Sequence, residues 1–398
     1  MSKAIVVLDN HFVKLSDGRI LNNGIVSEDF LRKYSQYYPE VYFLGRTLHF
    51  NEDELRANSE FSNYKEVKFK DGKEIFKPLP MFRNLQDLRK KYREINKNVK
   101  ILLNSVEDAR VILRVPSLLS SIVYYSLPKR LKDKVIIECV ADLSQVTPSM
   151  TRSAIVKNKI LNYWTKRIAS RAFAASYVTK YALQEVYPAK RAKVKSHYSS
   201  IDLKDDFYFK REIENKPIWK IVHVSTLNQN TKGHSLLLRL SKKLIENSYN
   251  IEVDIVGGGR YKDFYENEAK KLGISQHVNF LGNISNKEEL RQIYINSDLM
   301  IFPTEFEGLP RVLIEAMACS LPCIATNVNG IPELLQSEDM FNVGDFNGFY
   351  NRTVEYLESL EAMKQASSRN YEIAQNYEYK KLQERRLNFF KAIDENWR

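Results

Sequence analysis

Two carboxylates stand eight residues apart where an apolar run ends and a helix is predicted to begin. Glu307 belongs to the turn Glu305–Pro310, and Glu315 belongs to the segment that follows it. A helix N-terminus has unpaired N–H groups and partial positive charge, so the Gly308–Leu309–Pro310 turn suits a diphosphate. Glu307 can then face a hydroxyl-rich group beside that anion, and Glu315 can accept from hydroxyls on the other side. A sugar, a diphosphate and a ribose in a row match this layout, which predicts transfer of a sugar from a nucleotide.

A lysine and a run of glycines extend the predicted donor site. Lys232 stands just before the predicted helix start at Gly233–His234, where a compact cation can neutralise a departing diphosphate. Gly257–Gly258–Gly259 follows an apolar strand, and glycines let a backbone approach a ligand closely. The sequence has no Asp-x-Asp pair after a strand to hold a divalent ion. We therefore expect Lys232 and the helix N-terminus to neutralise the diphosphate, with no metal and no other cofactor.

The run from Pro303 to Leu335 continues this pattern and resembles a known enzyme family. The E-x7-E spacing is followed by Glu315–Pro322 and by Gly330–Glu333, and together these resemble the donor-binding segment of retaining glycosyltransferases of family 4. Members of that family have the GT-B fold. The resemblance implies metal-independent transfer on one face of the sugar, where the leaving phosphate helps to take the acceptor proton. Ser320 departs from the family, which usually has glycine there.

The resemblance also implies a role for each residue on the donor side. Lys232 and the Gly308–Leu309–Pro310 turn hold the diphosphate, and Glu315 binds the ribose hydroxyls. Glu307 holds the sugar and stabilises its cationic anomeric centre, so Lys232 and Glu307 are also catalytic candidates. Family members usually have an arginine where this chain has Thr226, and Asn283 and Ile284 are expected beside the nucleobase. The donor-binding candidates are Thr226, Lys232, Gly257, Gly258, Asn283, Ile284, Glu307, Gly308, Leu309, Pro310 and Glu315.

Residues of the first half are expected to bind the acceptor. Asp142 stands at the carboxyl end of a predicted strand, where ligands bind in open α/β sheets, and it can orient or deprotonate a hydroxyl. A helix cap or an ion pair would explain Asp142 as well. Arg114–Ser117 and Glu138–Asp142 resemble segments of a bacterial polysaccharide branch of family 4, and Asn23–Gly24 stands where family members have a Gly-Gly loop. The acceptor-binding candidates are Gly24, Arg114 and Asp142, and Asp142 is a third catalytic candidate.

Strand and helix patterns alternate along the chain, which is typical of α/β domains with parallel sheets. The 398 residues suffice for two such domains, and the expected fold is GT-B, with two Rossmann-like, doubly wound domains facing a central cleft. We place an acceptor-binding domain at residues 1–212 and a domain that binds the nucleotide sugar at residues 213–375. The resemblance implies that a final helix, residues 376–398, crosses back to the first domain.

Several elements are predicted from local pattern alone. Ala4–Leu8 is expected to be a buried strand followed by a long polar loop, and a helix is expected over Leu85–Asn96. The short apolar runs at Lys100–Leu103 and Val111–Leu113 favour two further strands. Residues 152–173 have helical periodicity, with basic residues interleaved with an apolar stripe. This pattern predicts an amphipathic basic helix, which either packs on the core or contacts an anionic membrane surface.

Positive charge is concentrated in the first half of the chain. Residues 1–200 hold 36 Lys and Arg against 20 Asp and Glu, a balance of +16, whereas residues 201–398 hold 25 against 29, a balance of −4. This asymmetry favours contact with an anionic membrane surface, and simple solubility or nucleic-acid binding are the other interpretations. The sequence has no apolar run that could span a bilayer, and the N-terminus leads directly into a predicted strand. We expect a cytoplasmic protein, peripheral at the inner face of the cytoplasmic membrane.

The favoured hypothesis is a retaining hexosyltransferase. It would move a hexose from a nucleoside-diphosphate sugar, a UDP-sugar in preference to a GDP-sugar, to a saccharide or lipid-linked saccharide acceptor. The product would be a bacterial surface polysaccharide such as capsule or O-antigen. A GT-B sugar-nucleotide epimerase is the second hypothesis, because it would share the donor pocket. The third is a basic nucleic-acid-binding protein, although residues 151–200 contain no recognisable reader motif, so we expect no nucleic-acid partner.

Overall fold

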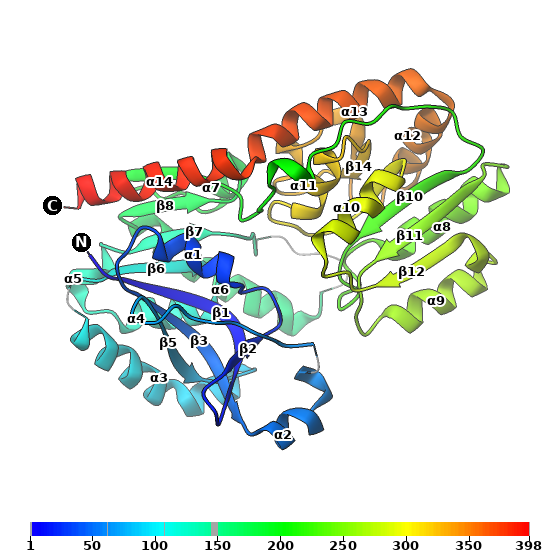
Figure 1. Cartoon of the computed structure of the whole chain (residues 1–398). Coiled ribbons are helices and arrows are strands. Elements are labelled where there is room, and N and C mark those ends of the chain that lie inside the picture. Colours follow the sequence, from blue (N-terminus) through cyan, green and yellow to red (C-terminus); the bar gives the residue numbers. More distant parts are fainter. Residues whose placement is uncertain (1, 62, 107, 145–149, 398) are drawn as a thin grey trace.

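The computed structural model describes residues 2–61, 63–106, 108–144 and 150–397, and it contains two largely parallel β-sheets covered by helices (Figure 1). Each sheet is the centre of one α/β unit, and we call these the N-terminal unit and the C-terminal unit. The α/β class with doubly wound sheets that the sequence predicts is confirmed.

The N-terminal sheet has a parallel part in the order β5–β3–β1–β6–β7–β8–β9, and two antiparallel strands, β2 and β4, extend one end of β1. The strands are β1 (Ala4–Leu15), β2 (Ile20–Asn22), β3 (Val41–Phe50), β4 (Lys65–Glu66), β5 (Glu74–Pro80), β6 (Arg110–Val115), β7 (Ile136–Cys139), β8 (Ala174–Tyr177) and β9 (Val194–His197). The helices are α1 (Glu28–Ser35), α2 (Glu52–Ala57), α3 (Leu85–Ser105), α4 (Leu118–Ser126), α5 (Lys129–Lys132), α6 (Arg152–Arg171) and α7 (Ala182–Val186).

The C-terminal sheet is parallel throughout, in the order β12–β11–β10–β13–β14–β15. Its strands are β10 (Trp219–Val224), β11 (Ile251–Val256), β12 (Val278–Gly282), β13 (Leu299–Phe302), β14 (Cys323–Thr326) and β15 (Met340–Phe341). Its helices are α8 (His234–Glu246), α9 (Lys262–Lys271), α10 (Lys287–Asn296), α11 (Arg311–Ala318), α12 (Phe346–Glu358) and α13 (Leu360–Ala374). The strand order reverses between β10 and β13, and in sheets of this kind ligands bind outside the carboxyl ends of the strands at that switch point.

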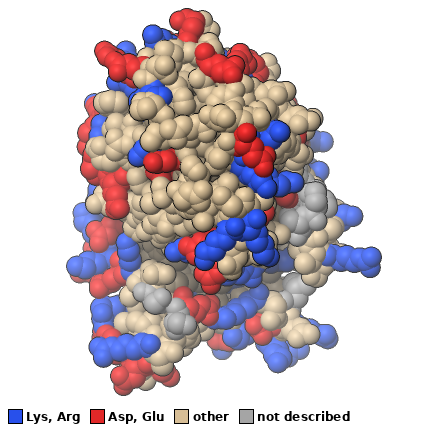
Figure 2. All heavy atoms as spheres, turned by 90° about the vertical axis from the view of Figure 1, so that its right-hand side faces the viewer, with Lys and Arg blue, Asp and Glu red and all other residues tan. Residues whose placement is uncertain are grey.

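The surface reflects the uneven distribution of charge along the sequence. Seen from the right-hand side of Figure 1, Lys and Arg side chains are dense over the lower half of the molecule, whereas both signs are mixed above (Figure 2). Within the described residues, no helix combines the length and the apolar character needed to cross a bilayer.

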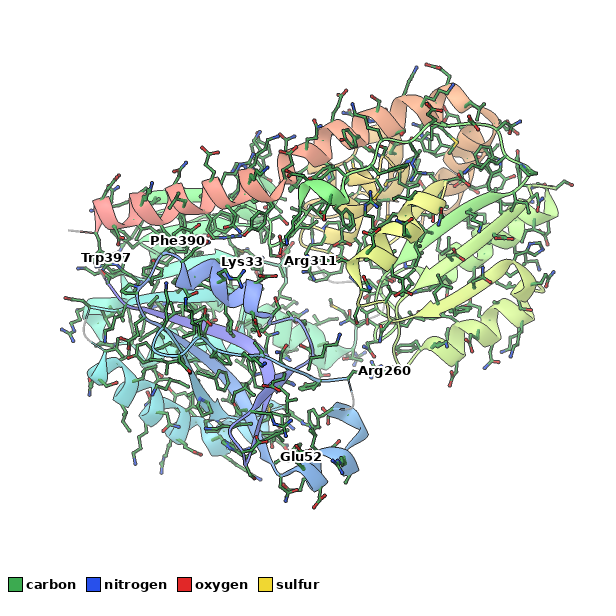
Figure 3. The ribbon with its side chains drawn as sticks, viewed as in Figure 1. Lys33, Glu52, Arg260, Arg311, Phe390 and Trp397 are labelled. Atoms are coloured by element: carbon green, nitrogen blue, oxygen red, sulfur yellow. The ribbon has the colours of Figure 1, made fainter. Side chains whose placement is uncertain are left out.

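The last helix, α14 (Tyr379–Asn396), packs on the N-terminal unit although it follows the C-terminal unit in sequence. Phe390 lies against Tyr37 and Tyr38 with ring centroids 5.0 and 5.4 Å apart, and Trp397 lies 4.8 Å from Phe173 (Figure 3). A bridge between Leu203 and Glu378 brings the outgoing and returning chain segments side by side. The C-terminal end of the chain is therefore part of the N-terminal core.

The loops of the two units touch at the carboxyl ends of β7 and β8. A Cβ placed on Gly308 would lie only 2.7 Å from the carbonyl oxygen of Val140, and one placed on Gly330 would lie 2.8 Å from the side chain of Thr179. The carboxylate of Glu333 accepts from the backbone N–H groups of Lys180, Tyr181 and Ala182 at 2.5, 2.8 and 2.9 Å. The carboxyl ends of the N-terminal strands therefore face the C-terminal unit.

The expected long polar loop after Leu8 is wrong, because β1 continues to Leu15. A register shift between Leu8 and His11 absorbs the polar residues at this point, and Phe12 and Val13 beyond it are fully buried. The polar interruption marks a bulge in the strand instead of its end.

The expected strand at Lys100–Leu103 is also wrong, because these residues belong to α3, which runs well beyond the predicted end at Asn96. Ile95, Val99, Leu102 and Val106 are buried, and their spacings of four, three and four follow the period of a helix. A window of four apolar residues is too short to distinguish this period from that of a buried strand. The expected strand at Val111–Leu113 is confirmed as part of β6.

Candidate active site

Lys232 and Glu307, both predicted from motifs, meet at the switch point of the C-terminal sheet. Lys232 lies in the loop after β10, and Glu307 lies in the loop after β13. The Nζ of Lys232 donates to the carbonyl oxygen of Phe306 at 3.1 Å and forms an ion pair with the carboxylate of Glu307. The two side chains are 13% and 20% exposed, so the pair is shielded without being sealed from solvent.

The two loops are fixed to each other by backbone contacts. The N–H of Glu305 donates to the carbonyl oxygen of Thr231 at 2.8 Å, and the hydroxyl of Thr304 donates to the same oxygen at 3.4 Å. Gly233 has φ of +77°, and a Cβ there would collide with the carbonyl of Pro303. Glycine at 233 therefore allows the loop that carries Lys232 to lie directly on the end of β13.

A buried histidine pair lies behind Lys232. The Nδ1 of His223 is 2.9 Å from the carbonyl oxygen of Ile301, so Nδ1 carries the proton and donates. The Nε2 of His223 then accepts from the hydroxyl of Ser225 at 2.8 Å, and Ser225 Oγ accepts from the Nε2 of His234 at 3.1 Å. Burial lowers the pKa of His223 to about 4 and that of His234 to about 2. Both rings are neutral near pH 7, so they position the loop without adding charge to it.

The glycine run after β11 has a structural reason that the sequence did not reveal. Gly257 and Gly259 have φ of +133° and +148°, and a Cβ on either would collide with the loop after β10. The N–H of Leu227 donates to the carbonyl oxygen of Gly258 at 2.9 Å, and Thr226 Oγ1 donates to the same oxygen at 3.5 Å. These glycines let the turn pack against the loop that leads to Lys232.

The predicted residues beyond this turn are brought to the same end of the sheet. A Cβ on Gly258 would lie 2.8 Å from the side chain of Asn283, so Asn283 stands directly over the glycine turn. Ile284, next along the chain, packs partly buried against the core. Thr226, Gly258 and Asn283 thus form one edge of the candidate donor site.

The Gly308–Leu309–Pro310 turn leads directly into α11. Pro310 occupies the N-cap position and offers no side-chain acceptor to the first-turn N–H groups. The turn is held from behind, because the N–H of Gly330 donates to the carbonyl oxygen of Gly308 at 2.9 Å and Asn329 donates to that of Glu307. The first N–H groups of α11 therefore have no side-chain cap, and the turn before them touches the N-terminal unit at Gly308.

Glu315 lies further along α11 in a half-buried position. The hydroxyl of Tyr294 donates to its carboxylate at 3.3 Å. Burial raises the pKa of Glu315 above its ordinary value, and the positive charge of Arg311 and the Tyr294 hydrogen bond oppose this effect. Glu315 is thus a shielded acceptor one helical turn from Arg311.

The acceptor candidates of the N-terminal unit do not form one cluster of similar character. Asp142 is 2% exposed, and its carboxylate accepts from the N–H of Ser144 at 2.7 Å and from the hydroxyl of Tyr187 at 3.5 Å. Gly24 lies in an exposed turn with φ of +81°. Of the three, Arg114 is the one that lines a pocket.

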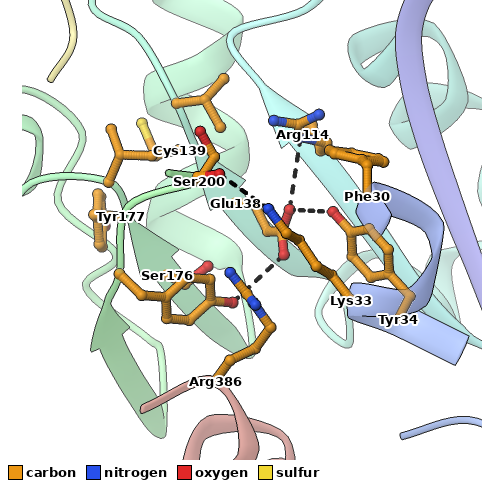
Figure 4. A pocket seen from close by; sticks show the side chains of 13 residues that line it. Phe30, Lys33, Tyr34, Arg114, Glu138, Cys139, Ser176, Tyr177, Ser200 and Arg386 are labelled. Atoms are coloured by element: carbon orange, nitrogen blue, oxygen red, sulfur yellow. Dashed lines mark hydrogen bonds and ion pairs between the residues drawn. The ribbon is translucent and has the colours of Figure 1, made fainter. Parts of the chain in front are cut away.

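That pocket contains charged residues that sequence reasoning missed (Figure 4). Lys33 comes from α1, Glu138 from β7 and Arg386 from α14, and they join Arg114 from β6. Glu138 was noted only as part of a segment resemblance, and Lys33 and Arg386 lie in helices with ordinary solvent-facing patterns. The chain brings them together through topology, for which the sequence offers no local signal.

The residues that the structure describes include no group of three or more His, Cys, Asp or Glu side chains that could hold a metal ion. The cysteines Cys139, Cys319 and Cys323 are buried free thiols. Ser320, where the sequence departs from the family that it resembles, adopts φ of +54°, and its hydroxyl donates to the carbonyl oxygen of Phe209 at 2.8 Å. The turn is thus kept, and the serine anchors the segment between the two units.

The second half of the chain is similar to known glycosyl transferases. Residues 204–377 match the family model described as "Glycosyl transferases group 1". The chain is 28% identical over 359 residues to Protein CapJ of Staphylococcus aureus, covering 86% of this chain and 88% of that protein. These matches support a glycosyltransferase.

Solved structures confirm the GT-B fold. Sucrose-phosphate synthase from Thermosynechococcus elongatus superposes with a TM-score of 0.72 at 12% identity, covering 99% of this chain and 100% of that one. Anabaena Alr3699/HepE, solved in complex with UDP, gives a TM-score of 0.65 at 13% identity over 98% and 100% of the two chains. At such low identity the likeness concerns the fold.

Proposed function

Because residues 204–377 match the group 1 glycosyl transferase model and the fold is GT-B, we propose that the protein is a retaining, metal-independent hexosyltransferase. The donor is a nucleoside-diphosphate sugar, with UDP as the nucleotide, and the acceptor is a saccharide or lipid-linked saccharide of a bacterial surface polysaccharide. The observation that carries the proposal is the meeting of Lys232 and Glu307 at the switch point, beside the uncapped start of α11.

Each step of the transfer then has a group in place. The bond between the anomeric carbon and the diphosphate oxygen breaks while the acceptor oxygen bonds to the same face of that carbon. The acceptor proton passes to the departing phosphate oxygen. Lys232 and the first N–H groups of α11 stabilise the charge that develops on the diphosphate. Glu307 stabilises the positive charge that develops on the sugar, so no protein nucleophile is required.

The remaining candidates bind or orient. Glu315 accepts from the ribose hydroxyls, and the edge formed by Thr226, Gly257, Gly258, Asn283 and Ile284 receives the nucleobase end of the donor. Asp142, whose carboxylate also holds its own loop, orients the acceptor hydroxyl, and Arg114 and Gly24 bind the acceptor on the side of the N-terminal unit. The solved complex of Anabaena Alr3699/HepE with UDP supports UDP as the nucleotide. Residues 1–212, 213–375 and 376–398 remain our proposed division of the chain.

One face of α6 supports a peripheral membrane position at the cytoplasmic side. Val156, Ile160 and Tyr163 are 58%, 42% and 61% exposed, and their spacings of four and three place them on one side of the helix. Lys159, Lys166 and Arg167 are exposed on the same side. Apolar side chains flanked by lysines suit a surface of anionic lipid.

The membrane contact is testable with vesicles. Replacing both Ile160 and Tyr163 with serine should weaken binding to phosphatidylglycerol vesicles and leave the weak binding to phosphatidylcholine vesicles unchanged. Equal binding of the parent protein to the two vesicle types would contradict a role for anionic lipid.

The donor site is tested by comparing UDP with uridine. Lys232→Ala should weaken the binding of UDP about tenfold or more, because a charge-assisted contact to the diphosphate is lost. The affinity for uridine should change little. Lys271→Ala, at an exposed position of α9, is the matched control. Equal losses for UDP and uridine would mean that Lys232 does not touch the diphosphate. Turnover of the nucleotide sugar without any acceptor would point to an epimerase instead.

A further inference from the structure

The pocket of the N-terminal unit holds more positive than negative charge. Lys33, Arg114 and Arg386 line it together with the single carboxylate of Glu138. We call these four residues the cation pocket. Of the three cations in the pocket, only Arg114 lies within ion-pair distance of a carboxylate among the described residues. Its Nε is 3.6 Å from the carboxylate of Glu138.

The other two cations have neutral partners. The Nζ of Lys33 donates to the carbonyl oxygen of Ser200 at 2.9 Å. Arg386 is 3% exposed, donates to the side chain of Gln383 at 3.1 Å and lies 4.8 Å above the ring of Tyr198. Both side chains are thus held in place without an opposite charge.

Glu138 is already engaged and cannot balance three cations. Its carboxylate accepts from the hydroxyl of Tyr34 at 2.6 Å and from that of Tyr198 at 3.4 Å (Figure 4). The Nε of Arg114 is buried and makes no hydrogen bond, because the nearest oxygen of Glu138 is 3.6 Å away, so the guanidinium is only weakly compensated. The pocket therefore combines fixed donors with an uncompensated charge of about two units, which is unfavourable until an anion arrives.

A further cation approaches from the opposite unit. Burial lowers the pKa of Lys33 to about 8, and the positive charges of Arg386, Arg114 and Arg311 contribute to the shift. Asp202 opposes it, but Asp202 is paired with Lys287 at 3.7 Å. Arg311 begins α11, and Figure 3 shows Lys33 and Arg311 on facing sides of the region where the two units meet.

The position of the pocket relates it to the transfer reaction. Its walls come from the carboxyl ends of β6, β7 and β8 and include Val140, which the Gly308 turn of the candidate donor site contacts. The lining belongs to the N-terminal unit and to α14, whereas all the donor candidates, the Gly308–Leu309–Pro310 turn included, lie in the C-terminal unit. The pocket is small, so it suits a compact anionic group better than a whole sugar ring.

We propose that the cation pocket binds a phosphate group carried by the acceptor, so that the acceptor substrate is a phosphorylated saccharide. Lys33 and Arg386 contact the phosphate oxygens, and Arg114, which Glu138 holds in place, adds its positive charge. This inference rests on the proposed glycosyl transfer and names the acceptor class for it. The phosphate can belong to a lipid-linked saccharide or to a soluble sugar phosphate.

The test measures binding of glucose 1-phosphate to the whole protein saturated with UDP. Calorimetry should detect binding of glucose 1-phosphate and much weaker binding of glucose. Lys33→Gln should weaken the binding of glucose 1-phosphate about tenfold or more, while the affinity for UDP stays unchanged. Lys33→Arg should restore much of the loss, and Lys90→Gln, at an exposed position of α3, should have no effect. Arg386→Lys provides a second variant in case Lys33→Gln folds poorly.

Two further probes distinguish the sources of the phosphate. Farnesyl diphosphate represents the lipid-linked source, and inorganic phosphate represents the group alone. Tighter binding of farnesyl diphosphate than of glucose 1-phosphate, again lost in Lys33→Gln, would support a lipid-linked acceptor, and the reverse order would support a soluble sugar phosphate. Equal loss of UDP and phosphate affinity in Lys33→Gln would overturn the proposal, because the cations would then belong to the donor. Absence of binding by every phosphate probe would also overturn it, while the UDP comparison for Lys232 would still decide the donor site.

Discussion

The two charged regions that face each other in this protein are built in opposite ways. On the donor side, one cation, Lys232, is paired with one carboxylate, Glu307, and both come from loops of the same sheet. In the cation pocket, three cations surround one carboxylate, and they come from the sheet, from α1 and from the last helix. A balanced pair is stable without a ligand, whereas an excess of buried charge is stabilised only by a counter-ion. The difference suggests that Lys232 and Glu307 exchange each other for groups of the substrate when the donor binds. The cation pocket would instead gain an anionic partner that it lacks without a ligand.

The largest expected effect concerns the donor-side pair. Glu307→Ala should lower turnover by about a hundredfold to a thousandfold, because a charge aimed at the transition state is lost. UDP affinity and phosphate binding in the cation pocket should remain close to those of the parent protein. Steady-state kinetics and calorimetry with UDP provide the measurement, and Glu246→Ala on the exposed face of α8 is the control. Full residual turnover with loss of UDP affinity would reverse the assigned role.

The contact between the two regions is the next target. Gly308→Ala would place a methyl group 2.7 Å from the carbonyl oxygen of Val140 and so push the donor turn away from the pocket wall. Turnover should fall about tenfold, since small misplacements of reacting groups are costly. UDP affinity should change less, because the lost fit lies between the units. Gly18→Asn, at a turn with open space around it, is the control, and unchanged kinetics in Gly308→Ala would show that this contact is not needed.

A smaller effect, on the pH dependence of stability, should come from the buried histidine pair that lies behind Lys232 on the donor side. In the folded protein the pKa of His223 is about 4 and that of His234 is about 2, both below the ordinary value of 6.5. Below pH 6.5 the unfolded chain binds protons that the folded chain does not, so stability is full above that pH and falls as the pH drops toward 4. Each histidine should contribute a slope of about 1.4 kcal/mol per pH unit in this window.

Urea unfolding of the parent protein and of His234→Gln at pH 7, 6 and 5 measures that slope. The variant should be less stable at pH 7 and should lose less stability on acidification. His49→Gln, at an exposed position of β3, should retain the parent slope. Parallel curves for His234→Gln and the parent would mean that the histidine pair does not titrate on unfolding.

The smallest expected effect is none. Chelation with EDTA should leave glycosyl transfer unchanged, because Lys232 and the start of α11 neutralise the diphosphate in our proposal. Inhibition that added magnesium reverses would contradict this scheme and would place a cation between the donor-side pair and the substrate.

The same contrast explains what the sequence could and could not reveal. Lys232 and Glu307 lie in short motifs next to apolar strands, so their meeting follows from the strand order of a doubly wound sheet. Lys33 and Arg386 are separated by most of the chain and are joined only because α14 returns to the N-terminal unit. Their helices read as ordinary amphipathic ones, and a single sequence provides no measure of such a long-range contact.

The glycines show a different limit of the sequence. Gly257 and Gly259 look like residues that allow a ligand to approach, and the structure gives them positive φ angles and close contact with another loop. Composition alone does not distinguish these two uses. The predicted strand at Lys100–Leu103 was wrong for a related reason, because four residues are too few to establish a period. The α/β pattern was predictable because it repeats over both halves of the chain.

The bridge between Leu203 and Glu378 has a mechanical consequence. The chain leaves the N-terminal unit and re-enters it at neighbouring points, so these points act as a single pivot for any rotation of one unit against the other. Displacement in such a movement grows with distance from the pivot. Arg386 lies two helical turns beyond the bridge and would shift little, whereas parts of the C-terminal unit further from the bridge would shift more. A rotation of this kind would thus change the spacing between the two units far from the bridge and leave the region beside the bridge nearly unchanged.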